Sequence, residues 1–202
     1  MVRKIREEKK QTSTLWIFCE GLTETRYLEN LRVTERLRLK IKPILSSYKP
    51  SEQIVDEALK FMSNRGEFDK NRDIVACFFD RDDKTQNSNE ILLAAKKKAR
   101  DKIILGYSNP SFEYWILCHH GYYPDVSYDQ NQVYELVKTK FNLDTKSEKE
   151  LYEKTKDRIE LAKKNAKKIK EFHLKNNVEL ISRESTPLTL VYEVLNKINE
   201  FK

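Results

Sequence analysis

The sequence predicts one α/β domain with a mostly parallel sheet of about four strands flanked by helices and a helical C-terminal extension. Short apolar runs alternate with amphipathic helical segments up to about residue 120, which is the order typical of a parallel sheet. Only helical patterns follow that point. The 202 residues include 4 Gly and 5 Pro, too few for a turn-dense all-β fold.

Four segments are predicted to be strands. Residues 13–19 and 73–79 are continuous apolar runs, a pattern typical of strands that are buried on both faces of a sheet. We therefore expect these two strands to be neighbours in the middle of the sheet. Residues 40–46 contain Pro43, which favours an edge position, and residues 102–106 form a short fourth strand.

Helices are expected between and after these strands, because apolar residues recur there at helical spacing. Thr23 is the expected N-cap of the first helix, and Ser51 begins the second. Pro110 suits the first turn of a helix that follows the fourth strand. The remaining predicted helices span residues 88–100, 129–141, about 147–173, and from Ser185 or Thr186 to about 200.

The net charge and the cysteines indicate what the protein binds and in which compartment it lies. Lys and Arg outnumber Asp and Glu by 39 to 32, and the resulting net charge of +7 favours an anionic partner such as nucleic acid. Cys19, Cys77 and Cys118 are odd in number and form no CxxC pair, so we expect reduced thiols in a cytoplasmic protein. The start of the chain has no apolar run, so no signal peptide and no membrane partner are expected.

Lysines gather on the long helix predicted near residues 147–173. Two interpretations stay open: a solvated helix face, or a basic surface that follows nucleic-acid phosphates. The lysines concerned are Lys163, Lys164, Lys167 and Lys168.

Acidic and polar side chains follow three of the predicted strands. Because the carboxyl ends of parallel strands meet at one edge of a sheet, we expect these groups to lie close together. Several carboxylates at one edge repel each other, and a hard cation such as Mg²⁺ or Mn²⁺ removes that cost. For Asp80-Arg81-Asp82 alone, a solvated acidic turn is the simpler alternative. The groups are Glu20 and Glu24 after the first strand, Asp80, Asp82 and Asp83 after the third, and Ser108, Asn109 and Glu113 after the fourth.

The same stretches resemble known families. Glu20-Gly21 after a first strand and Asp80-Arg81-Asp82 after a later one are similar to the Toprim domain of topoisomerases, primases and OLD-type nucleases. Residues 20–27, 79–83 and 108–119 together resemble the three signature blocks of the RloB family, and residues 185–187 are loosely similar to its last block. The resemblance extends from residue 14 to about residue 120.

This resemblance implies an architecture and a function. A Toprim-like α/β domain would span residues 13–125, between a charged arm over 1–12 and a helical part over 126–202 that packs on the same core. RloB-like proteins belong to prokaryotic defence and abortive-infection loci, often beside a gene for an ABC-type ATPase. The implied activity is a Mg²⁺- or Mn²⁺-dependent endonuclease that cuts RNA, such as tRNA, or DNA. The sequence leaves monomer and homodimer open.

The resemblance also implies roles for individual residues. Glu20 would be the catalytic general acid/base, Asp80 and Asp82 would hold metal, and Glu24 and Glu113 would hold a second ion as in OLD-type sites. For Arg81 a phosphate contact and a pairing with a carboxylate both stay open, and for His119 packing inside a helix is favoured. The candidates for supporting roles are Arg81, Asp83, Ser108, Asn109 and His119.

Two other functions and one other metal site compete with these assignments. A regulatory or binding subunit of the ATPase would use the acids to hold a structural ion, but such an ion does not require the additional carboxylate of Glu20. Transfer chemistry, as in primases, ranks lowest because no Gly-rich nucleotide-binding loop is visible. Zinc at Cys118-His119-His120 is not favoured, because adjacent residues on a helix point apart.

Overall fold

The computed structural model describes residues 13–37, 39–43, 50–64, 66–81 and 87–199. Within these ranges the chain forms a five-stranded sheet in the order β2-β1-β3-β4-β5. The predicted arm over 1–12 lies outside the described residues. Four strands are parallel and the fifth is antiparallel: β1 (Leu15–Cys19), β2 (Leu39–Pro43), β3 (Ile74–Asp80), β4 (Ile103–Asn109) and β5 (Leu188–Thr189).

The two most apolar strands, β1 and β3, are neighbours inside the sheet, as the sequence predicts. Their parallel register pairs Leu15 with Ile74 and Cys19 with Phe78. Every residue of β1 is buried, and so are the five central residues of β3. The position between other strands and between two helical layers explains why neither strand alternates with polar residues.

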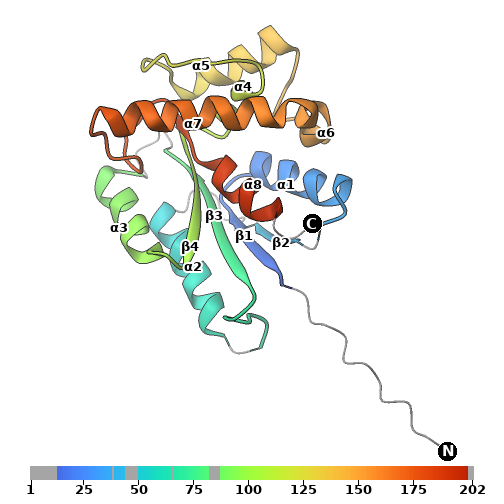
Figure 1. The fold of residues 1–202 in the computed structure, drawn as a ribbon, viewed down its shortest axis with the longest axis vertical. Coiled ribbons are helices and arrows are strands. Elements are labelled where there is room, and N and C mark those ends of the chain that lie inside the picture. Colours follow the sequence, from blue (N-terminus) through green and yellow to red (C-terminus); the bar gives the residue numbers. More distant parts are fainter. Residues whose placement is uncertain (1–12, 38, 44–49, 65, 82–86, 200–202) are drawn as a thin grey trace, which may run out of the picture.

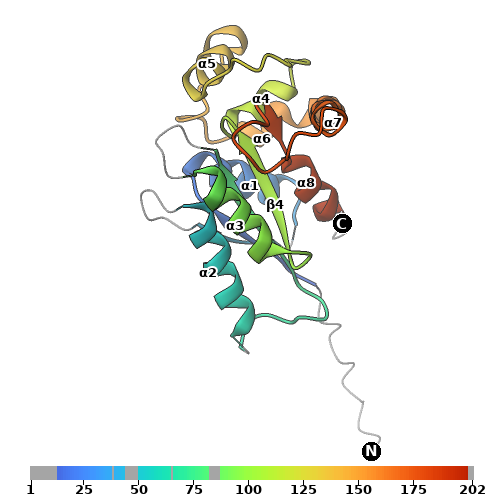
Figure 2. The same ribbon diagram turned by 90° about the vertical axis from the view of Figure 1, so that its left-hand side faces the viewer.

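Helices cover both faces of this sheet (Figures 1 and 2). On one face, α1 (Leu22–Thr34) and α8 (Val191–Asn199) line a common groove. On the other face, α2 (Ser51–Ser63) packs against α3 (Asn89–Ala99). The predicted helices that begin at Ser51 and span 88–100 are thereby confirmed.

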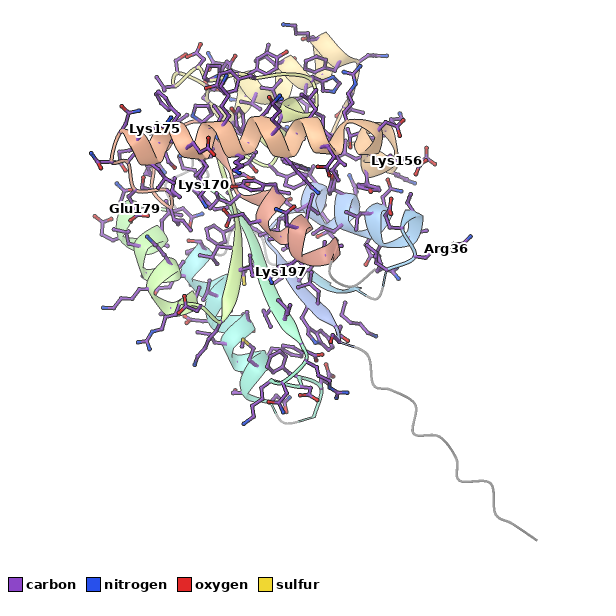
Figure 3. The ribbon with its side chains drawn as sticks, in the orientation of Figure 1. Arg36, Lys156, Lys170, Lys175, Glu179 and Lys197 are labelled. Carbon is purple, nitrogen blue, oxygen red and sulfur yellow. The ribbon has the colours of Figure 1, made fainter. Side chains whose placement is uncertain are left out.

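The remaining helices lie at and beyond the carboxyl ends of the parallel strands. In Figure 1, α4 and α5 lie above the strands and α7 runs across the molecule. Lys156 lies just before α7, and Lys170 and Lys175 lie along it (Figure 3). These elements are α4 (Glu113–Cys118), α5 (Gln130–Glu135) with the π-helical turn η1 (Leu136–Lys140), α6 (Leu151–Thr155), the 3₁₀ turn η2 (Lys156–Arg158) and α7 (Ile159–Lys175).

The C-terminal helices and the sheet share one apolar core. Val133, Ile169 and Leu195 belong to the same buried cluster as Ile17 and Phe78. Cys19, Cys77 and Cys118 are all buried and free of disulfides. None of the helices in the described ranges is both long enough and apolar enough to cross a membrane.

The end of the chain differs from its prediction. The last helix begins at Val191 and not near residue 185. The residues just after Pro187 form the strand β5, which pairs with the edge of β4. Leu188 pairs with Asn109 and Thr189 pairs with Ser108. A strand of two residues is too short to show a periodic sequence pattern. It is extended because it pairs with the edge of β4.

Other boundaries were also predicted wrongly. The helix expected over 147–173 is divided into α6 and α7 by the tighter turn η2. Gly21, and not Thr23, is the N-cap of α1, and it makes no side-chain cap. The fourth strand continues to Asn109, and α4 begins at Glu113, three residues after Pro110.

Candidate acidic site at the carboxyl edge of the sheet

A cleft of about 290 Å³ opens at the carboxyl ends of β1 and β3. Four carboxylates from different elements line it: Glu20 follows β1, Glu24 lies in the first turn of α1, Asp80 ends β3, and Glu113 begins α4. The structure therefore brings together four of the acids that the sequence singles out. Asp82 and Asp83 lie outside the described residues.

The pairing of β1 with β3 continues into the loop that carries the first acid. The Glu20 N–H donates to the Phe78 carbonyl at 3.1 Å, and the Asp80 N–H donates to Glu20 Oε2 at 3.3 Å. These two bonds fix Glu20 beside the end of β3. The sheet register itself thus places the Glu20 carboxylate next to Asp80.

Gly21 lets the Glu24 carboxylate fold back over the loop. A Cβ atom at position 21 would lie 2.3 Å from Glu24 Oε2, far inside van der Waals contact. Glu24 is only 4% exposed, so its side chain has little space to move away. A larger residue at position 21 would therefore displace the Glu24 carboxylate from this place.

Glu113 is held by hydrogen bonds to both of its carboxylate oxygens. Ser111 Oγ donates to Oε2 at 2.7 Å, and Thr145 Oγ1 donates to Oε1 at 3.0 Å. Glu113 is 6% exposed and Thr145 is fully buried. The two donated bonds fix the orientation of this carboxylate. Thr145 gives no signal in the sequence, because it is a lone threonine in a loop 32 positions away.

The carboxylates repel each other, and this changes their protonation. Burial, followed by the negative charges of Glu113 and Glu20, raises the pKa of Glu24 from 4.5 to about 8. Burial and the charges of Glu24, Glu20 and Glu113 also raise the pKa of Asp80 well above its usual range. Near neutral pH the cleft therefore retains protons that a cation could replace.

The donor set suits a hard divalent cation, because carboxylate oxygens are the ligands that Mg²⁺ and Mn²⁺ prefer. However, no three Asp, Glu, His or Cys side chains among the described residues converge closely enough to hold an ion as they stand. The four acids share a cleft and an electrostatic field, but not a coordination sphere. Ion binding would require their side chains to turn towards one point.

Ser108 and Asn109 connect β4 to the C-terminal segment. Asn109 Nδ2 donates to the Ser182 carbonyl at 3.1 Å and Asn109 Oδ1 accepts from Thr186 Oγ1 at 2.8 Å. Ser108 Oγ lies 3.3 Å from Thr189 Oγ1. These contacts are directed to residues 182–189, and neither residue lines the acidic cleft.

Arg81 and His119 are also placed away from the cleft lining. Arg81 donates from Nη1 to Thr186 Oγ1 at 3.0 Å and from its N–H to the Ser108 carbonyl at 2.9 Å. His119 is fully buried, its Nδ1 lies 2.9 Å from the Trp115 carbonyl, and its ring packs edge-on against Trp115. Burial lowers the pKa of His119 to about 4, which is typical of a neutral, packed histidine.

The lysines of α7 are not part of the cleft lining. Lys163 forms an ion pair with Glu160 at 2.8 Å, and the Lys168 ammonium lies 4.0 Å from the centre of the Tyr122 ring. Lys164 and Lys167 are exposed. Instead, the cation that lines the cleft is Lys146, in the loop after η1. The sequence analysis missed it, since one lysine in a loop forms no pattern.

Comparison with known proteins gives one result. The family model described as RloB-like protein matches residues 15–198 of this chain. Neither the curated proteins nor the solved structures include a significant match.

Proposed function

Because the chain belongs to the RloB-like family, we propose that it is a Toprim-type, metal-dependent endonuclease that acts as an effector of prokaryotic abortive-infection defence against phage. The single observation that carries the proposal is the cleft in which Glu20, Glu24, Asp80 and Glu113 meet. The resemblance to defence proteins supports the biological role. The chemistry of the cleft supports hydrolysis of a phosphodiester in RNA, tRNA included, or DNA.

In the proposed mechanism, three of the four acids are metal ligands and one transfers protons. A bound Mg²⁺ or Mn²⁺ supplies positive charge against the scissile phosphate and lowers the pKa of a water. Asp80 and Glu113 are the proposed ligands, together with Glu24 once its proton is lost. Glu20 accepts the proton of the attacking water and returns one to the leaving oxygen. Its fixed place beside the end of β3 suits this task, because a proton acceptor must stay within hydrogen-bonding distance of the reacting water.

A second candidate is a non-catalytic subunit that binds the co-encoded ABC-type ATPase. One observation favours it: the acids do not form a ready coordination sphere among the described residues. In that case Glu24 would be a buried, protonated acid that never binds a metal ion, and its raised pKa would have no catalytic meaning. The two candidates differ in whether divalent cations bind and whether a phosphodiester is cut.

The experiment incubates the purified chain, with and without the neighbouring ATPase, with tRNA and plasmid DNA in the presence of Mg²⁺ or Mn²⁺. We expect cleavage that chelation abolishes, and toxicity in cells that depends on the ATPase. Asp80→Asn should lose both ion binding in calorimetry and cleavage. Glu20→Gln should keep the ion and lose cleavage by roughly 10²–10⁴-fold.

Asp101→Asn is the matched control, because Asp101 is exposed and lies before the amino end of β4. It should cut as the parent does. The nuclease proposal fails if the parent binds no divalent cation, or if Asp80→Asn cuts at the parental rate. Either result would leave the ATPase-binding subunit as the better account.

A further inference from the structure

We propose that Lys146 contacts a phosphate of the nucleic-acid substrate at the acidic cleft, and that the segment from Asp129 to Lys146 exists in part to hold it there. The inference rests on the proposed nuclease function and adds a substrate-positioning residue to it. Lys146 lies in the helical region, where the sequence singles out only the lysines of the later helix as possible phosphate contacts.

The charge of the cleft requires such a residue. Four acidic side chains face a substrate that is itself a polyanion, and those that are ionised repel its phosphates. Among the described residues that line the cleft, Lys146 is the one lysine or arginine. An ammonium at this position would offset repulsion between the cleft and the phosphates on either side of the cut.

The loop that carries Lys146 is fixed to α1 and α4, and by one hydrogen bond within the loop itself. The Arg26 guanidinium of α1 donates to the Lys146 carbonyl. Thr145, the preceding residue, is buried and donates to Glu113 at 3.0 Å. Asp144 Oδ1 accepts from the Lys146 N–H at 3.1 Å. The backbone at position 146 is therefore connected directly to α1, and the side chain of the preceding residue is connected to Glu113, an acid of the cleft.

The side chain of Lys146 has a defined resting place that leaves its charge available. Its ammonium lies 4.0 Å from the centre of the Tyr134 ring, an exposed cation–π contact of modest strength. Tyr134 is held in turn by Asp144, because its hydroxyl donates to Asp144 Oδ1 at 3.1 Å. Within the described part of the chain, no carboxylate forms an ion pair with Lys146.

The chain offers a matched control at the same ring. The ammonium of Lys138 also lies over Tyr134, at 5.4 Å from its centre, and Lys138 is exposed like Lys146. Lys138 does not line the cleft. A general effect of net charge or of the tyrosine would affect both lysines equally, whereas a phosphate contact at the cleft would affect Lys146 alone.

The experiment measures binding first, in a Glu20→Gln background that does not cut. Labelled single-stranded RNA and DNA of the same sequence are titrated by fluorescence anisotropy with Mg²⁺ over a series of salt concentrations. Lys146→Gln should weaken binding of both strands about tenfold and flatten the slope of log K against log salt by about 0.7, the value for one lost phosphate contact on a single strand. Lys146→Arg should bind as the background does, and Lys138→Gln should change neither quantity.

Calorimetry with Mn²⁺ and steady-state cleavage complete the test. Lys146→Gln should bind the ion as the parent does, and in the cutting background it should raise KM far more than it lowers kcat. Equal losses in Lys146→Gln and Lys138→Gln, or an unchanged salt slope in Lys146→Gln, would overturn the proposal. If the parent binds strands through Lys146 but cuts none of them, the nuclease function fails while the phosphate contact stands. If the parent binds no strand, both fail.

Discussion

Glu24→Gln tests whether burial, and after it the charges of Glu113 and Glu20, make the ionised form of Glu24 costly in the folded chain. The pKa of Glu24 is about 8 in the folded chain and 4.5 in an ordinary carboxyl group. The pKa is higher in the folded state, so protonation of Glu24 stabilises the folded state. This contribution to the free energy of unfolding is complete below about pH 4.5 and is lost as the pH rises towards 8. Between these values only the folded state holds the proton, so the free energy of unfolding falls by about 1.4 kcal/mol per pH unit.

Across about pH 5 to about pH 8, Glu24 should therefore lower the free energy of unfolding of the parent by about 4 kcal/mol. Glutamine has nearly the same shape and does not titrate, so Glu24→Gln should not show this loss. Its stability advantage over the parent should grow steadily with pH and reach roughly 10 °C in Tm near pH 8. Removal of the charge at position 24 also relieves Asp80, which acts in the same direction.

The assay is urea unfolding in EDTA at several pH values, followed by circular dichroism. Glu171→Gln, at an exposed position on α7, serves as the control and should follow the parent. Addition of Mg²⁺ near pH 8 should stabilise the parent more than Glu24→Gln, because the ion replaces the proton that was lost. Parallel pH profiles for the parent and Glu24→Gln would refute the reasoning, since the pKa of Glu24 would then be the same in the folded and unfolded chain.

Three further changes test other parts of the structure. Gly21→Ala should cost about 1–3 kcal/mol and weaken Mn²⁺ binding, because its Cβ would displace the Glu24 carboxylate; unaltered urea unfolding and calorimetry would contradict this. Asn109→Ala should lower the free energy of unfolding by about 2–4 kcal/mol, since it removes the bonds to Ser182 and Thr186; thermal denaturation checks it, and a Tm equal to that of the parent would show that these bonds contribute nothing. Combined replacement of four α7 lysines by Gln should flatten the salt dependence of nucleic-acid binding by roughly one unit per lost phosphate contact, and an unchanged slope would identify them as a solvated face. The lysines are Lys163, Lys164, Lys167 and Lys168.

The parts of the fold that could be predicted are those whose pattern is local. The unbroken apolar runs of β1 and β3 require burial on both faces, which places them inside the sheet whatever the rest of the chain does. Glu20 and Asp80 follow those runs directly, so their convergence follows from the parallel order of the strands. Glu24 and Glu113 lie within the first turns of the helices that follow β1 and β4.

The parts that could not be predicted depend on distant contacts. Leu188 and Thr189 are extended because β4 has a free edge, and nothing within residues 185–190 indicates it. Thr145 and Lys146 reach the cleft because Arg26, Asp144 and Glu113 hold their loop, and a loop has no periodicity that identifies its contacts. Ser108 and Asn109 lie at the carboxyl end of β4, where the sequence predicts site residues. Their side chains instead bind the C-terminal segment, at Thr189 and Ser182.

The attachment of β5 to β4 has a consequence for how the chain reaches its active form. Ser108 and Asn109 find their partners 73 to 81 positions later, so this edge of β4 stays unpaired during synthesis until residues 182–189 have emerged from the ribosome. Contacts of such long sequence separation form late and slowly. For the proposed nuclease, late pairing of β5 with β4 would delay completion of the sheet whose carboxyl edge carries the acidic cleft.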